Sequence, residues 1–425
     1  MFIVWVVLFG LLGVPVVFTL AFGPFMDLVS SGKSFMIGTL IQRALAGIGK
    51  FELLAVPLFI LAGEIMNRGG ITERIVRFSH VFVGRLRGGL AHVNILASIL
   101  FAGLSGSAVA DTSALGSILI PSMVKDGYSK EYSTAVTAAS SIIGPIIPPS
   151  IIMIVYSYVM EVSIGALFAS GIIPGILMGV ALMLMTAALA EKHHFPAGVK
   201  LSLKESFKAI YQGILPVLTP FIILGGILSG VITPTEAAIV AVAYAFFLSL
   251  LVFRTTTLKA SWSIFKKSSI QAGVILLVIG SAAMFGWILT LSRIPQNFAE
   301  FITTITPNKY VFLLLVNLFL FVVGMFLDAG PAILILGPIL GHAIKVFGIN
   351  PTHFAVVMCV NLTIGLATPP FGLVLFAAST ISGLPVITIA KTMVPYYAVH
   401  LAVVLLITFI PEISLWLPRM FGLPV

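Results

Sequence analysis

The sequence predicts an all-α polytopic membrane protein built as an inverted repeat, with two re-entrant hairpins and two broken helices. Of its 425 residues, 59% are hydrophobic and only 9% are charged, and the mean hydropathy is +1.17. In a soluble globular domain about a quarter of the residues are charged. The apolar runs are continuous over the length of a bilayer and do not alternate with polar residues, which indicates helices and not a β-barrel.

Two of the apolar segments, 132–160 and 353–379, are each interrupted by a glycine and a pair of prolines. The first contains the run IIGPIIPPS at 142–150, and the second contains TIGLATPPFG at 363–372. Proline lacks an N–H and clashes with the preceding turn, so a helix cannot pass through either run intact. Carbonyls freed at membrane depth persist only where they line a cavity or bind a ligand. Two broken helices in corresponding positions indicate the binding site of a transporter.

The N-terminal part of the chain is expected to hold two spans and an interfacial segment. The first span covers 2–23 and has no cleavage signature, so we expect it to be retained. Residues 25–50 mix basic and apolar side chains, which is typical of a segment lying in the membrane interface. The second span covers 51–66. Glu64 stands one helical turn before Arg68, and we interpret this spacing as a structural ion pair.

A dense basic stretch follows the second span. Its spacing fits a helix lying on the membrane surface, and the positive-inside rule places it in the cytoplasm. Because such basic loops act as determinants of topology, they account for the net charge of +9, and we expect no nucleic-acid partner. The stretch comprises Arg68, Arg74, Arg77, Arg85 and Arg87.

The segments 88–124 and 310–347 are too long for one crossing of the bilayer and too short for two. Each half of the first has about 16 residues, which is about 24 Å of helix, whereas the hydrocarbon core is about 30 Å thick. We therefore predict two re-entrant hairpins, each of which enters and leaves the membrane on the same side. Their tips, at 103–112 and 324–331, are rich in small residues and are expected near the middle of the bilayer.

Full-length spans are predicted between and after the two broken helices. Four of them separate the broken helices, including 164–189 and 271–291, and a final span covers 386–410. Because of these four spans, the two broken helices run in opposite directions. Thr233 and Glu236 flank a helix start with proline at its first position, which predicts a capping box. Glu236 is therefore interpreted as a cap and not as a carrier of substrate.

The two halves of the chain match as an inverted repeat around a site near the membrane midplane. The hairpins align at a shift of 217 residues and the broken helices at a shift of 221, so we place a four-residue insertion between them. The matched residues are Asp111 with Asp328 and Pro121 with Pro338 in the hairpins, and Gly144, Pro148, Pro149 and Pro174 with Gly365, Pro369, Pro370 and Pro395 after them.

A hairpin tip that faces a broken helix supplies the oxygen ligands that a hard cation such as Na⁺ requires. The donors are a carboxylate, hydroxyls and the carbonyls of helix ends. We expect two pseudosymmetric sodium sites. The first comprises Ser105, Ser107, Asp111 and Thr112 of the first hairpin with Ser141, Gly144 and Pro148 of the first broken helix, and the second comprises Asp328, Gly330, Asn361, Gly365 and Thr368.

The helices that restart after the breaks present N–H groups, which suit the carboxylate of a small organic anion. The predicted substrate contacts are Ser107, Asp111, Ser150 and Arg293. Each kind of contact has a structural alternative. The aspartates could cap hairpin helices, the hydroxyls could bond to the preceding turn, and Arg293 could anchor its helix at the interface. For a carboxylate near the midplane, however, a functional role is the default because its burial is costly.

The runs at 103–112, 144–150, 324–331 and 365–372 resemble those of the large membrane (M) subunit of tripartite ATP-independent periplasmic (TRAP) transporters, in particular the sialic acid type. The resemblance covers essentially the whole chain. It implies a sodium-driven, elevator-type transporter, similar to the ion transporter superfamily, in the bacterial inner membrane. It also implies two partners, a small four-helix membrane (Q) subunit and a periplasmic substrate-binding (P) protein. Sialic acid is the preferred substrate, with C4-dicarboxylates as the alternative.

In such an architecture the chain alternates between fixed and moving parts. We expect scaffold spans and an amphipathic arm in 1–87, and the first transport-domain repeat in 88–190. Scaffold spans and the second arm are expected in 191–308, and the second transport-domain repeat in 309–425.

Three rival functions are weighed against this interpretation. The sequence has no Walker A motif, no His-Glu-x-x-His and no dinucleotide fingerprint, so we expect neither an enzyme nor direct use of ATP. A stand-alone sodium-dicarboxylate symporter is the leading alternative. An ion channel fits less well, because both the hairpin and the broken helix are duplicated. Since the tips and breaks consist mostly of Gly, Ala, Ser, Thr and Pro, we expect selectivity to come mainly from the binding protein.

Overall fold

The computed structural model describes residues 2–192, 195–196, 198 and 201–425, and these residues form helices joined by turns, without any strand. Six of the described helices are long and apolar enough to cross a bilayer, or nine if each bent pair of helices is one span. The predicted all-α polytopic class is therefore confirmed.

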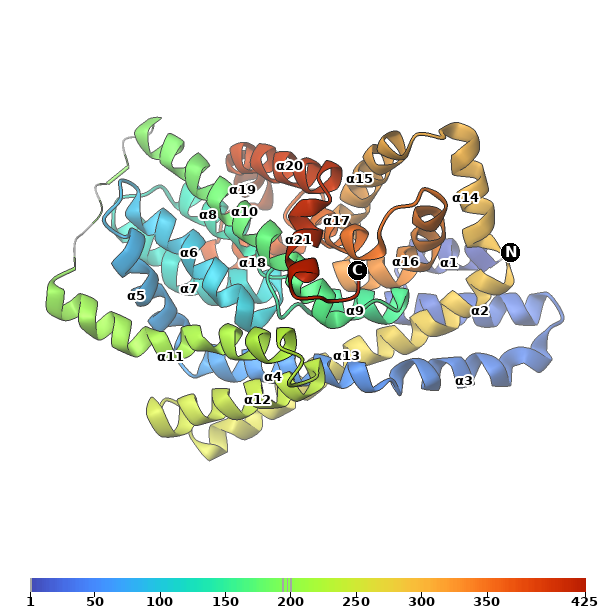
Figure 1. Ribbon diagram of the computed structural model, residues 1–425, viewed down its shortest axis with the longest axis horizontal. Helices are drawn as coiled ribbons and strands as arrows, with labels where there is room; N and C mark the ends of the chain where they lie inside the picture. Colours follow the sequence, from blue (N-terminus) through green and yellow to red (C-terminus); the bar gives the residue numbers. More distant parts are fainter. Residues whose placement is uncertain (1, 193–194, 197, 199–200) are drawn as a thin grey trace.

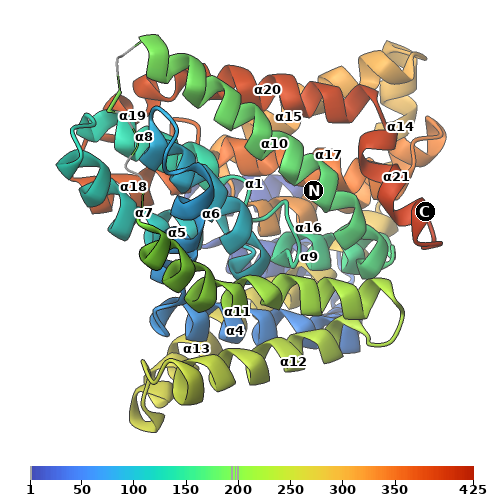
Figure 2. The same ribbon diagram turned by 60° about the vertical axis from the view of Figure 1, so that its left-hand side comes forward.

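A group of helices lies along one side of the molecule, at the bottom of Figures 1 and 2, and we call it the outer layer. In this group α4 packs against α12 and α13, α13 also packs against α3, and α11 packs against α12. Large apolar side chains are exposed on α3, α11, α12 and α13, as expected for surfaces that face lipid. The outer layer comprises α3 (Ile37–Ile48), α4 (Ala55–Arg68), α11 (Leu203–Leu228), α12 (Pro234–Phe246) and α13 (Leu258–Leu291).

An amphipathic helix precedes each hairpin. These helices are α5 (Ile71–Val83), which contains part of the predicted basic stretch, and α14 (Ile294–Ile305). Ile71 and Ile75 are fully buried on one side of α5, which packs against α11 and against α6 (Gly89–Ser105). The predicted helical arm after the second span is thus present in the structure.

Both predicted hairpins and both predicted broken helices are present, and each break falls on its glycine-proline run. Hairpin 1 is α6 (Gly89–Ser105) and α7 (Ala108–Lys125), and broken helix 1 is α8 (Lys130–Ser141) and α9 (Ile151–Met160). Hairpin 2 is α15 (Lys309–Phe326) and α16 (Ala329–Val346), and broken helix 2 is α17 (Pro351–Gly365) and α18 (Leu373–Ser382).

The structure corrects the alignment of the two hairpins. Ser107 caps α7 and Asp328 caps α16, and these positions are 221 residues apart. The caps of α8 and α17 have the same separation, so the predicted four-residue insertion is wrong. Asp328 therefore corresponds to Ser107, and Asp111 corresponds to Ala332. The two aspartates match in residue type, but the equivalence of positions is set by where the backbone turns.

The first span predicted at 2–23 is also wrong. α1 (Phe2–Leu11) ends at a turn in which Gly13 has a φ of 74°, and α2 (Val16–Ser30) folds back against α1. A β-carbon on Gly23 would overlap Val6, so the two helices are in close contact at this point. The run is apolar enough to span a bilayer, but glycine permits a left-handed turn in its middle.

The span after each broken helix differs between the two repeats. α10 (Ile164–Lys192) is one long helix. Its counterpart is divided into α19 (Val386–Thr392) and α20 (Val394–Phe409), so the final span predicted at 386–410 is interrupted. The remaining elements are α21 (Glu412–Met420), the short helical turns η1 (Ser34–Met36) and η2 (Phe51–Leu54), and the π-helical turn η3 (Phe247–Val252).

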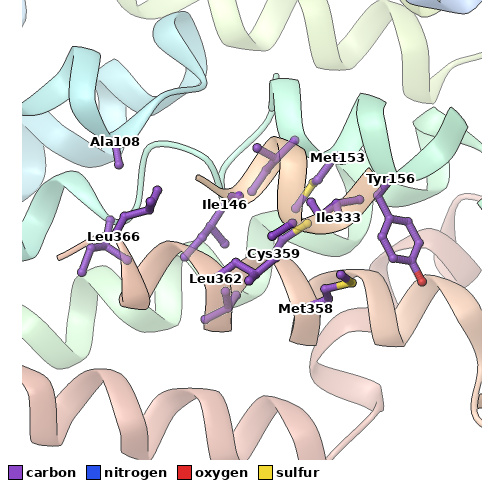
Figure 3. Packing of buried hydrophobic residues seen from close by; sticks show 14 of the residues in the cluster. Ala108, Ile146, Met153, Tyr156, Ile333, Met358, Cys359, Leu362 and Leu366 are labelled. Atoms are coloured by element: carbon purple, nitrogen blue, oxygen red, sulfur yellow. The ribbon is translucent and has the colours of Figure 1, made fainter. Parts of the chain in front are cut away.

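The two repeats share one apolar core. Figure 3 shows Ile146 of the first break, Met153 of α9, Ile333 of α16 and Leu362 of α17 close together, and all four are buried. α16 packs against both α9 and α17. Hairpin 2 therefore rests on both broken helices, and close packing holds the junctions of the two repeats in a fixed relation.

Candidate functional site

The tip of hairpin 1 lies directly on the break of broken helix 1. Gly106 ends α6 with a φ of 60°, and a β-carbon there would lie 2.7 Å from the Pro149 carbonyl oxygen and 3.3 Å from the Ile151 nitrogen. Only glycine combines this left-handed conformation with so close an approach. A β-carbon on Gly103 would lie 3.5 Å from the Pro148 carbonyl oxygen. The expected pairing of hairpin 1 with broken helix 1 is confirmed.

Asp111 lies in the first turn of α7 and is fully buried at this junction. Its Oδ1 accepts a hydrogen bond from the Ser105 hydroxyl. Its Oδ2 is buried and has no hydrogen-bond partner among the described residues. The carboxylate lies against Gly144, where a β-carbon would be 3.0 Å from Asp111 Cγ and would clash with Oδ2. A buried carboxylate oxygen without a donor is costly unless a cation or a proton occupies it.

The break supplies backbone oxygens beside this carboxylate. Pro148 has no N–H with which to bond the Gly144 carbonyl one turn earlier. Ser150 is buried, and its hydroxyl donates to the Pro145 carbonyl at 2.5 Å and accepts from the Met153 N–H at 3.3 Å. Ser150 therefore stabilises the break and caps α9, as well as standing at the predicted substrate site.

Two helix N-termini meet at the junction, those of α7 and α9. The Ser107 hydroxyl caps α7 and accepts a hydrogen bond from the Ala110 N–H at 3.4 Å. Ser107 is half-buried, so part of it stays accessible. Helix N-termini carry partial positive charge and unpaired N–H groups, so this arrangement can hold a carboxylate. A cation beside Asp111 and an anion at the N-termini would then be neighbours.

The other hydroxyls of the first predicted sodium site bond to their own helices. Thr112 Oγ1 donates to the Ala108 carbonyl at 2.8 Å, and Ser141 Oγ donates to the Thr137 carbonyl at 2.7 Å. This is the structural alternative considered for membrane hydroxyls. Each oxygen keeps lone pairs that a cation can use, so their role as ligands stays a prediction.

Hairpin 2 packs on broken helix 2 through backbone contact and amides. A β-carbon on Gly324 would lie 2.7 Å from the Leu362 carbonyl oxygen and 3.1 Å from the Gly365 α-carbon. Asn361 Nδ2 donates to Asn317 Oδ1 at 2.7 Å, which links α17 to α15, and both amides are buried. The second pairing of hairpin and broken helix is also as expected.

The second predicted sodium site is open where the first is enclosed. Asp328 is exposed and, as the cap of α16, accepts a hydrogen bond from the Ala329 N–H at 2.8 Å. A β-carbon on Gly330 would stand in open space, with no described atom within 4 Å apart from the adjacent residues and the backbone of its own helix. Thr368 Oγ1 donates to the Ile364 carbonyl at 2.9 Å. The structure therefore does not enclose this carboxylate as it encloses Asp111, and sodium binding here stays a prediction.

Arg293 lies apart from the other predicted substrate contacts. It is exposed at the start of α14, with a φ of 54°. It is not among the residues that line the cavity beside Ser105 and Ser107. Its contact with substrate stays a prediction, and its position also fits the alternative of an interfacial anchor.

A cavity of about 510 Å³ lies between hairpin 1 and the outer layer. Figure 2 shows α6 and α7 above α4 and α13. Small-molecule sites commonly enclose about 300–1,000 Å³, so the size suits a small organic anion. The polar residues of its lining are Ser105, Ser107 and Ser113 on hairpin 1, Glu64 and Asn67 on α4, and Lys267 and Gln271 on α13.

The outer layer forms one wall of this cavity, and the sequence alone does not predict that wall. Lys267 precedes the span predicted at 271–291, but α13 begins directly after its cap Thr257. Lys267 therefore lies in the helix, and its Nζ donates to Glu64 Oε1 at 2.8 Å. The predicted pair of Glu64 with Arg68 is confirmed, also at 2.8 Å. A threonine at the cap position is the one local signal for the earlier helix start.

Residues 3–413 match the family described as tripartite ATP-independent periplasmic transporter, DctM component. The chain belongs to this family. It is 42% identical over 409 residues to the sialic acid TRAP transporter large permease protein SiaM of Vibrio cholerae, with 96% of each chain covered. It is 38% identical over 373 residues to the C4-dicarboxylate TRAP transporter large permease protein DctM of Pseudomonas aeruginosa, with 88% of this chain and 87% of that protein covered.

The fold of this DctM-family protein is similar to that of a solved transporter, YdaH of Alcanivorax borkumensis. The TM-score is 0.66 at 16% sequence identity, and the match covers 93% of this chain and 90% of the other. At this identity the likeness concerns the fold alone. The chain is thus the large permease subunit of a TRAP transporter for substrate uptake, a multi-pass protein of the inner membrane.

Proposed function

We propose that this large permease imports a small organic anion by coupling it to sodium, with sialic acid preferred and C4-dicarboxylates as the alternative. The observation that carries the proposal is the buried Asp111 carboxylate. Its Oδ2 has no hydrogen-bond partner among the described residues and faces broken helix 1 at Gly144. A carboxylate at membrane depth is costly and is functional by default. A bound sodium ion would neutralise it.

The residues around Asp111 fit a hard cation. Ser105 and Ser107 contribute hydroxyl oxygens, and the carbonyl of Gly144 is freed by Pro148. Such a set of a carboxylate, hydroxyls and carbonyls is what a hard cation accepts. The second predicted site, around Asp328 and Thr368, belongs to the same proposal.

The substrate carboxylate would bind next to this ion. The N-termini of α7 and α9 meet at the same place, and a cation and an anion bound side by side reduce the cost of taking either out of water. This mutual stabilisation is the physical basis of coupling. Sialic acid is preferred because the sialic acid permease is 42% identical to this chain, against 38% for the C4-dicarboxylate permease of Pseudomonas aeruginosa.

The division of the chain into moving and fixed parts is part of the same proposal. Hairpin 2 packs on both broken helices, and a cavity opens between hairpin 1 and the outer layer beside their direct contacts. We propose that residues 88–190 and 309–425 move together, elevator-like, against the scaffold of 1–87 and 191–308. A small four-helix membrane (Q) subunit would brace the scaffold, and a periplasmic binding (P) protein would deliver the anion, as the tripartite description of the family suggests.

The proposal is tested with all three components in proteoliposomes. Uptake of labelled sialic acid is expected only with an inward sodium gradient, the small subunit and the loaded binding protein. Equal uptake when potassium replaces sodium would overturn sodium coupling. Strong sodium-driven uptake by this chain alone would instead favour the stand-alone symporter.

A further inference from the structure

The cavity beside hairpin 1 has two walls of different chemistry. The polar side chains on the hairpin wall are short hydroxyls, which offer little discrimination between substrates. The opposite wall, which we call the selector wall, carries long polar side chains with carboxylate, amide and ammonium groups. The hairpin wall has Ser105, Ser107 and Ser113, and the selector wall has Glu64, Asn67, Lys267 and Gln271.

A charged cluster forms the middle of the selector wall. Glu64 Oε1 accepts hydrogen bonds from Arg68 Nε and from Lys267 Nζ, both at 2.8 Å. Arg68 Nη1 also donates to Ser263 Oγ at 3.1 Å. The side chain of Glu64 is 10% exposed and that of Lys267 is 47% exposed. Both cations bond to Oε1, so Oε2 and the remaining N–H groups of Lys267 are offered to a molecule in the cavity.

The two walls meet at the tip of hairpin 1. A β-carbon on Gly63 would lie 3.0 Å from the carbonyl oxygen of Leu104, the residue before Ser105. Glu64 directly follows Gly63, and the side chains of Ser105 and Glu64 line the same cavity. A molecule held by its carboxylate at the hairpin tip would therefore lie within the cavity that Glu64 and Lys267 also line.

We propose that the selector wall distinguishes substrates by contacting the end remote from the carboxylate, and that it favours a monocarboxylate with a hydroxylated, amide-bearing tail over a compact dicarboxylate. The inference rests on the proposed function, because it takes the tip of hairpin 1 as the carboxylate site. Hydroxyls donate to Glu64 and accept from Lys267, and the amides of Asn67 and Gln271 both donate and accept. A second carboxylate has no proton to donate to Glu64, and the ammonium of Lys267 that could attract it is already paired with Glu64 Oε1.

The decisive variant is Glu64→Gln, which keeps the size of the side chain and removes its charge. In the complete transport system, we expect the KM for sialic acid to rise about tenfold, as for the loss of a hydrogen bond to a charged group. Inhibition by succinate should become stronger, because the ammonium of Lys267 then lacks its carboxylate partner and attracts the second carboxylate. The sodium dependence should not change. The matched control is Glu412→Gln, which removes an exposed carboxylate paired with Arg419 at 2.6 Å outside the cavity and should leave the KM unchanged.

Exchanging the charges of Glu64 and Lys267 distinguishes a role in substrate selection from a purely structural ion pair. The double variant Glu64→Lys with Lys267→Glu restores an attractive pair between α4 and α13. A structural role predicts recovery of both the melting temperature and the KM. The selector wall predicts recovery of the melting temperature while the KM and the preference over succinate stay altered.

Failure of the inference is distinguishable from failure of the proposed function. Unchanged KM and succinate inhibition in Glu64→Gln would overturn the selector wall while sodium-driven uptake by the wild type stands. A wild type that prefers succinate to sialic acid would overturn it as well. Equal wild-type uptake in sodium and in potassium would overturn sodium coupling, and the KM comparison between the variants would still test the wall.

Discussion

A close backbone contact in the second repeat provides a sharp test of the packing at its junction. Gly365 of α17 lies against Gly324 of α15, and a β-carbon on Gly365 would be 2.9 Å from the Gly324 carbonyl oxygen and closer still to its carbonyl carbon. Nonbonded carbons prefer separations of about 3.5–4.0 Å. In a Gly365→Ala variant, hairpin 2 and broken helix 2 must therefore move apart by roughly half an ångström or more.

The size of the effect follows from what this movement disturbs. Backbone atoms cannot rotate away as a side chain can, and overpacking of a well-packed interior costs about 1–3 kcal/mol. The hydrogen bond from Asn361 to Asn317, 2.7 Å long and one turn away, would stretch, and a lost hydrogen bond adds about 1 kcal/mol. We expect Gly365→Ala to lower the free energy of unfolding by about 2–4 kcal/mol.

The assay is thermal unfolding of the purified protein in detergent, with sodium present. The control is Gly273→Ala in α13, where the new β-carbon would meet no described atom within 4 Å apart from the adjacent residues and the backbone of its own helix. That variant should be as stable as the wild type or more so, because alanine favours a helix by about 0.8–1.0 kcal/mol over glycine. A Gly365→Ala protein that melts with the wild type would refute the close contact between α15 and α17.

Three further predictions concern single side chains. Asp111→Asn should reduce sodium-driven uptake at least about tenfold. The variant should melt no lower than the wild type in sodium-free buffer, because the substitution removes an unpaired buried charge. Near-normal uptake would return Asp111 to a structural role. Arg293→Ala should raise the KM for the anion if the arginine contacts substrate, and an unchanged KM would leave it as an anchor. Thr233→Ala should lower the unfolding free energy by about 1 kcal/mol, because the Thr233–Glu236 capping box is lost; unchanged melting in detergent would contradict this.

The sequence by itself determined the class of the protein and most of its unusual backbone. Continuous apolar runs identify helices in a membrane. The runs around Gly144 and Gly365 locate both breaks, because proline lacks an N–H and interrupts the helix at its own position. The sequence predicted the path of the chain less well where a turn interrupts an apolar run. Gly13 turns the chain between α1 and α2, although hydropathy alone predicts a single span there.

The tertiary structure alone decided which carboxylate is buried and what faces it. Asp111 and Asp328 look equivalent in the sequence, yet one is enclosed against Gly144 and the other is an exposed cap. Glu64 and Lys267 are 203 residues apart and meet because α4 packs on α13. No local pattern carries that information, because burial and contact between distant segments depend on how the side chains of separate helices fill their shared space.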